Sequence, residues 1–143
     1  MVQVGLLEDN TRIAKLSATM LQHAGYCVTI YEHPRACLDA LLLQPLVSEK
    51  ESAPTQPANL DTVPVDVLIL DLNLPDIDGL AVVRELLSHP RTQALPLIFC
   101  TAASASEIFR ALRIAPLARA IGKPFTFQEL TSAVALALTS TNR

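Results

Sequence analysis

The sequence predicts an α/β protein in which helices cover both faces of a parallel sheet. Five short apolar runs alternate with segments of helical spacing along the 143 residues. The runs are almost continuously apolar, which is typical of strands that are buried on both faces. The length fits one domain, so we expect residues 1–143 to form a single unit.

The five predicted strands are rich in Val, Ile, Leu and aromatic residues. They comprise residues 2–7, 26–31, 65–70, 95–100 and 117–121. Each ends at a polar or turn-forming residue, which separates it from the helix that follows.

A helix is expected after each strand. Apolar residues recur at helical spacing from Ile13 to Leu21, with Asn10 before them as N-cap and Gly25 after them at the C-terminus. Further helices are predicted over residues 34–43 and 80–88. Two capping boxes, Ser104 with Glu107 and Thr126 with Glu129, open the last two helices, which run to Arg113 and to about Leu138.

Residues 44–64 interrupt this alternation. The segment contains four prolines and no apolar period, so we expect a mobile, proline-rich insertion at about 44–64. It does not read as a domain boundary, because too few residues precede it to form a domain.

Composition excludes several classes of function. The net charge is −3 and there is no basic cluster, so neither nucleic acid nor a membrane surface is an expected partner. No apolar run is long enough for a membrane span and no signal peptide opens the chain, so we expect a cytoplasmic protein. The cysteines, Cys27, Cys37 and Cys100, match no metal or redox spacing, and Cys27 and Cys100 are expected in the core.

Chemically active residues follow four of the five predicted strands. Glu8 and Asp9 follow the first strand, Asp71 the third, Thr101 the fourth and Lys123 the fifth. Ligands of open parallel sheets bind outside the carboxyl ends of the strands. We therefore expect these side chains to converge at one edge of the sheet.

Such a cluster has a definite chemistry. Three crowded carboxylates repel one another and need a cation, and oxygen ligands with room for water suit Mg²⁺. A hydroxyl and an ammonium beside the metal suit an anion with several oxygens, such as a phosphoryl group. A carboxylate placed there can itself act as nucleophile and become an aspartyl phosphate.

These residues resemble the receiver domain of response regulators in two-component signalling (the CheY-like superfamily) over nearly the whole chain. The resemblance rests on motifs in the family's order and spacing: the acidic pair Glu8-Asp9, Asp71 with a loop that carries Pro75 and Gly79, Thr101 followed by Ala102, and Lys123-Pro124-Phe125. Thr101 lies 30 residues after Asp71, and Lys123 lies 22 residues further along.

The resemblance implies a flavodoxin-like, doubly wound (βα)5 fold with strand order 2-1-3-4-5. It implies that Asp71 accepts a phosphoryl group from a histidine kinase or a histidine phosphotransfer protein, with Thr101 and Lys123 assisting. Mg²⁺ would be bound by Asp9, Asp71 and the backbone carbonyl of Asn73, with Glu8 acting mainly through water.

As a phosphoprotein of this kind, the domain would catalyse only its own phosphorylation and dephosphorylation, with Asn73 and Ala103 flanking the hydrolytic water. Phosphorylation would change its interaction surface toward a downstream effector or an attached output domain. The sequence names neither of these nor the kinase, and it leaves a homodimer open.

One position departs from the family pattern. Ala120 stands three residues before Lys123, where the family usually has a Tyr or Phe coupled to the threonine. This leaves open an alternative in which the domain is an interaction module that no longer depends on phosphorylation.

A second alternative is an enzyme, a haloacid-dehalogenase-like phosphohydrolase. That family also uses a nucleophilic Asp with Mg²⁺, but it needs a second Asp two residues later as general acid and base. Asn73 occupies that position, and an amide cannot transfer the proton.

Overall fold

The computed structural model describes residues 1–42, 63–74 and 78–141, and strands and helices alternate along these residues. The elements in order are β1 (Gln3–Leu7), α1 (Thr11–His23), β2 (Cys27–Tyr31), α2 (Pro34–Leu42), β3 (Val67–Leu70), α3 (Gly79–Ser88), β4 (Leu97–Thr101), α4 (Ala105–Ile114), β5 (Arg119–Gly122) and α5 (Phe127–Thr141).

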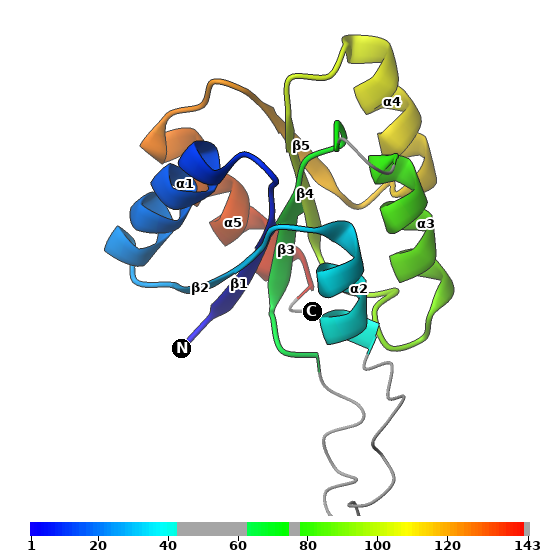
Figure 1. The fold of residues 1–143 in the computed structure, drawn as a ribbon, viewed down its shortest axis with the longest axis horizontal. Coiled ribbons are helices and arrows are strands. Elements are labelled where there is room, and N and C mark those ends of the chain that lie inside the picture. The colour runs from blue at the N-terminus through cyan, green and yellow to red at the C-terminus, as the bar shows by residue number, and fades with distance from the viewer. Residues whose placement is uncertain (43–62, 75–77, 142–143) are drawn as a thin grey trace, which may run out of the picture.

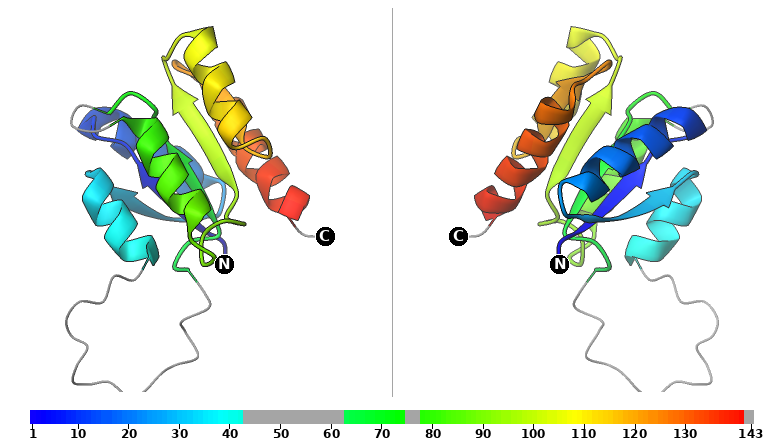
Figure 2. Two further views of the ribbon diagram at one scale, coloured as in Figure 1. Left: turned by 90° about the vertical axis from the view of Figure 1, so that its right-hand side faces the viewer. Right: turned by 90° about the vertical axis from the view of Figure 1, so that its left-hand side faces the viewer.

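All five strands are parallel and lie in the order β2-β1-β3-β4-β5, which confirms the predicted topology. The helices form a layer on each side of this sheet (Figure 1). Helices α1 and α5 cover one face, and α2, α3 and α4 cover the other (Figure 2).

Each face of the sheet has its own hydrophobic core, because successive side chains of a strand point to opposite faces. In β3, Leu68 and Leu70 pack under α2, α3 and α4, whereas Val67 and Ile69 pack under α1 and α5. All four are fully buried. This explains why the strand is apolar at every position rather than at alternate ones.

Local signals at the helix ends also behave as predicted. The Asn10 side chain accepts a hydrogen bond from the backbone N–H of Ile13 (3.0 Å) and caps α1. Gly25 follows the end of that helix with a φ of 100°, a conformation that glycine adopts without a steric penalty. Both predicted capping boxes are present, one at α4 and one before α5.

The structure corrects several details of the prediction. The third strand begins at Val67 rather than residue 65, and the Asp66 side chain before it accepts a hydrogen bond from the backbone N–H of Gln3 (2.8 Å). The fourth strand begins at Leu97 rather than residue 95, and the fifth begins at Arg119 rather than residue 117. Helix α5 continues to Thr141, beyond the expected end near Leu138. Cys27 is only half-buried, because it lies on the edge strand β2, whereas Cys100 is buried as expected. The predicted insertion at about 44–64 lies, except for residues 63 and 64, outside the described residues.

Candidate functional site

The carboxyl ends of β1, β3 and β5 bring four of the predicted site residues together. The backbone N–H groups of Glu8, Asp71 and Lys123 donate hydrogen bonds to the carbonyls of Tyr31, Leu7 and Thr101 respectively, each at 3.2 Å. The hydrogen-bonding pattern of the sheet thus continues one residue beyond each of these strands. The register of the sheet therefore sets the backbone positions from which these three side chains extend.

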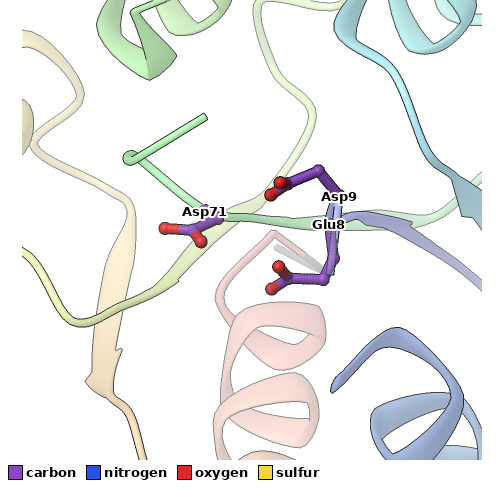
Figure 3. A group of neighbouring side chains, drawn as sticks. All are labelled: Glu8, Asp9 and Asp71. Carbon is purple, nitrogen blue, oxygen red and sulfur yellow. The ribbon is translucent and has the colours of Figure 1, made fainter. Parts of the chain in front are cut away.

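Glu8, Asp9 and Asp71 form an acidic cluster. Each contributes a carboxylate oxygen, and these three oxygens lie within 4.8 Å of one another. Figure 3 shows the three carboxylates gathered at one place beyond the strand ends. Glu8 and Asp71 are only 3% and 6% exposed, whereas Asp9 is exposed to solvent. Burial of like charges at this distance is unfavourable unless a cation compensates.

Lys123 supplies part of that compensation. Its Nζ lies 2.7 Å from Oε1 of Glu8 and 2.8 Å from Oδ2 of Asp71, and its side chain is 14% exposed. Burial by itself would lower the pKa of Lys123, but hydrogen bonds to Asp71 and Glu8 outweigh it, so the pKa is raised above 10.5. The ammonium is therefore charged at neutral pH.

Backbone groups hold the remaining carboxylate oxygens of the two buried acids. Oε2 of Glu8 accepts a hydrogen bond from the N–H of Asn10 (3.1 Å), and Oδ1 of Asp71 accepts one from the N–H of Asn73 (3.0 Å). Both bonds close tight turns just after a strand, so they restrict side-chain rotation as well as satisfying charge.

Thr101 ends β4, the strand next to β3. Its side chain is almost fully buried (1% exposed), and Oγ1 accepts a hydrogen bond from the N–H of Ala103 (3.1 Å). Ala120 pairs with Phe99 in the sheet and packs against the same core cluster as that ring. The Ala120 side chain is a methyl group, so this position has no aromatic ring that could change its rotamer together with Thr101.

The acidic cluster fits the requirements of Mg²⁺. All donors are oxygens, and three carboxylates with one ammonium carry a formal charge of −2, equal and opposite to that of the ion. Ligands at about 2.1 Å from an octahedral ion lie about 3 to 4 Å from one another. Small side-chain movements from the observed separations would reach that geometry.

One contact was not anticipated from the sequence. We expected Glu8 to act mainly on the metal through water and Lys123 to await an anion, but the two side chains form a direct ion pair. No spacing rule signals it, because the residues are 115 positions apart. Cys100 also lies near the cluster, and burial raises its pKa to about 12, so its thiol is protonated and unreactive.

Residues 4–135 match the family model of the response regulator receiver domain. The chain belongs to this family. It is therefore a signalling domain of two-component systems rather than a conventional enzyme.

Two curated relatives support the assignment. The chain is 36% identical over 133 residues to the transcriptional regulatory protein CreB of Escherichia coli, covering 92% of this chain and 48% of CreB. It is 31% identical over 130 residues to the transcriptional regulatory protein GltR of Pseudomonas aeruginosa, covering 90% of this chain and 46% of GltR. The receiver domain thus spans about half the length of these relatives.

The fold also agrees with solved receiver domains. The chemotaxis protein CheY4 of Vibrio cholerae superposes with a TM-score of 0.73 at 20% sequence identity, over 96% of this chain and 99% of that one. At this identity the likeness concerns the fold. Within the described part of the receiver domain, none of the helices combines the length and apolar character that crossing a bilayer requires.

Proposed function

We propose that Asp71 is the phosphoacceptor of this receiver domain, and that Mg²⁺ is its cofactor. The observation that carries the proposal is the position of the Asp71 carboxylate, which lies in a cluster of acids and within 2.8 Å of the Lys123 ammonium. A buried carboxylate with an ammonium beside it and further carboxylates that could hold a metal ion is suited to attack a phosphoryl group.

The chemical step is a displacement at phosphorus. A carboxylate oxygen of Asp71 forms a bond to the phosphorus atom while the bond from phosphorus to the donor breaks, and the donor nitrogen or oxygen retains the electron pair. Lys123 donates a hydrogen bond to a phosphoryl oxygen and offsets its charge, and the hydroxyl of Thr101 donates another. The product is an aspartyl phosphate.

Asp9, Asp71 and the backbone carbonyl of Asn73 are the groups that would hold Mg²⁺, with Glu8 contributing through water. When bound, the ion would neutralise charge on the phosphoryl oxygens during transfer. Asp9 is the exposed member of the cluster, so it is the first carboxylate that an ion arriving from solvent would meet.

Histidine kinases and output effectors are the partners of receiver domains in this family. We infer that the phosphodonor is a sensor histidine kinase or a histidine phosphotransfer protein, and that phosphorylation alters the interaction surface presented to an effector or output domain. Because Ala120 lacks a ring, the change at Thr101 must reach that surface by another route than a rotating aromatic side chain.

The test is to incubate the protein with Mg²⁺ and a small phosphodonor such as acetyl phosphate, and to follow its intact mass. We expect one added phosphoryl group, removable by hydroxylamine as an acyl phosphate should be. Asp71→Asn should abolish the addition. Asp39→Asn, an exposed change of the same chemistry on α2, should leave it intact.

Two outcomes would contradict the proposal. An unchanged mass in a protein that binds Mg²⁺ by calorimetry would favour the interaction module that does not depend on phosphorylation. Sustained release of phosphate from a chromogenic phosphate ester would favour a phosphohydrolase, although Asn73 lacks the acid and base function that such an enzyme needs.

A further inference from the structure

Glu8 is hydrogen-bonded to protein groups at its backbone N–H and at both carboxylate oxygens. Its backbone N–H donates to the carbonyl of Tyr31, Oε1 accepts from Lys123 (2.7 Å), and Oε2 accepts from the N–H of Asn10 (3.1 Å). Only 3% of the residue is exposed. Glu8 is therefore a fixed element of the site, with both carboxylate oxygens directed at protein donors.

The neighbouring acid is in a different situation. Asp9 follows Glu8 directly in the chain but is exposed, so its carboxylate can reach an ion in solvent without giving up a buried ion pair. The two members of the acidic pair thus have separate environments: one faces solvent and the other faces Lys123.

Lys123 needs an anchor of its own. Its ammonium is held by two carboxylates, Asp71 and Glu8, at 2.8 and 2.7 Å. When Asp71 becomes phosphorylated, its carboxylate loses its negative charge and the negative charge at this point is carried by the phosphoryl group. A lysine side chain is long and flexible, so a partner that changes during the reaction holds it poorly. Glu8 is the partner that does not change.

We infer that Glu8 is a positioning residue that acts through Lys123, holding its ammonium beside Asp71 so that it meets the incoming phosphoryl group. The inference rests on the proposed function, because it assigns a role within the phosphorylation of Asp71. The increase in the phosphorylation rate would come from the orientation of the Lys123 ammonium before the reaction, rather than from a new contact with the phosphodonor.

The test is a double-mutant cycle on the rate of phosphorylation. Glu8→Gln, Lys123→Met and the double variant are compared with the unaltered protein at concentrations of Mg²⁺ and acetyl phosphate that saturate each variant. Saturation removes any effect on metal or donor affinity from the comparison. Glu32→Gln, an exposed change of the same kind after β2, is the matched control and should leave the rate unaltered.

We expect Glu8→Gln to lower the maximal rate at least tenfold when Lys123 is present and less than twofold in the Lys123→Met background. A residue that acts through Lys123 has nothing left to position once the amine is gone. Equal losses in both backgrounds would overturn the inference, because Glu8 would then act independently of Lys123.

A second measurement needs neither metal nor phosphodonor. In the metal-free protein labelled with ¹⁵N-lysine, the Nζ signal of Lys123 should be protected from exchange with water, and Glu8→Gln should reduce that protection, because Asp71 then remains as a single partner. Protection that is unchanged in Glu8→Gln would overturn the inference. If the unaltered protein takes up no phosphoryl group, the proposed function fails together with this role. If it is phosphorylated but the two substitutions lower the rate additively, only the role of Glu8 is refuted.

Discussion

Lys123 acts as a built-in cation of the acidic cluster. Its ammonium lies within 2.8 Å of two of the three carboxylates and so occupies part of the negative field that would attract a metal ion. A lysine side chain is a compact point charge, and it repels any divalent ion that binds next to it. At the proposed phosphorylation site, the Lys123 ammonium and a bound Mg²⁺ would therefore compete for the same carboxylates.

Replacing Lys123 by methionine should strengthen Mg²⁺ binding while weakening phosphorylation. Like charges about 5 Å apart repel by several kcal/mol at an effective dielectric constant of about 20, so we expect the dissociation constant for Mg²⁺ to fall by at least tenfold. Isothermal titration calorimetry measures it. Lys15→Met on the exposed side of α1 removes the same charge elsewhere and should leave the constant unchanged. Weaker binding in Lys123→Met would show that the lysine supports the metal.

Gly79 is required by a close backbone contact beside the loop that follows Asp71. A Cβ at this position would lie 2.5 Å from Cα and 2.6 Å from the carbonyl oxygen of Leu72. Because backbone cannot move aside as a flexible side chain can, we expect Gly79→Ala to lower the free energy of unfolding by roughly 2–3 kcal/mol.

Urea denaturation tests the Gly79 prediction, and Gly122 provides the control. A Cβ at Gly122 would meet no atom within 4 Å, so Gly122→Ala should change stability by less than about 0.5 kcal/mol. If Gly79→Ala and Gly122→Ala lose similar amounts of stability, the contact with Leu72 is not the cause of the loss in Gly79→Ala.

At the scale of single elements, side-chain caps set where the helices near the site begin. Ser104 caps α4 just after β4, and its hydroxyl and the Glu107 carboxylate satisfy each other's backbone N–H groups. Thr126 and Glu129 do the same before α5, just after Lys123. The loops that leave the site are therefore short and end at defined points.

Ser104→Ala should lower the free energy of unfolding by about 1 kcal/mol, because it leaves the backbone N–H of Glu107 without the hydroxyl acceptor. Ser132→Ala, an exposed position within α5, should be neutral or slightly stabilising, since alanine is the better helix former. Chemical denaturation of both variants provides the comparison. Equal changes in the free energy of unfolding for Ser104→Ala and Ser132→Ala would mean that the capping box contributes nothing to stability.

At the scale of the whole molecule, the two cores make stability sensitive to alkaline pH. Cys37 lies in the core under α2, α3 and α4, and Cys100 lies in the one under α1 and α5. Burial raises the pKa of each thiol from 9.0 to about 12. In the unfolded chain these thiols ionise near their ordinary pKa, while in the folded protein they stay protonated. The contribution of the two thiols to stability is thus constant below pH 9 and is lost as the pH rises from 9 toward 12.

The free energy of unfolding should fall by on the order of 2 kcal/mol per buried thiol between pH 8 and pH 10.5. Denaturation in urea at both values measures the change. The double variant Cys37→Ala with Cys100→Ala should have lower stability at pH 8 but a smaller decrease on going to pH 10.5. A decrease of the same size in the double variant would assign the pH dependence to other groups.

The alternation of elements, the helix caps and the residues that meet at the carboxyl edge of the sheet could be predicted from the amino-acid sequence alone. These features depend on local chemistry: Val67–Leu70 is apolar at every position because both faces are covered, and Asn10 and Ser104 cap the helices that follow them within three residues. Glu8, Asp9, Asp71 and Lys123 could be singled out because each follows a predicted strand.

The different contacts and burial of these residues became visible only when the strands were assembled into the sheet. The ion pair between Glu8 and Lys123 joins positions 115 apart, and the burial of Glu8 beside the exposed Asp9 distinguishes two acids that are adjacent in sequence. Both depend on the register of parallel strands and on the reach of two long side chains across the sheet edge. No local pattern encodes these distances, because they arise only when separate strands are hydrogen-bonded in one sheet.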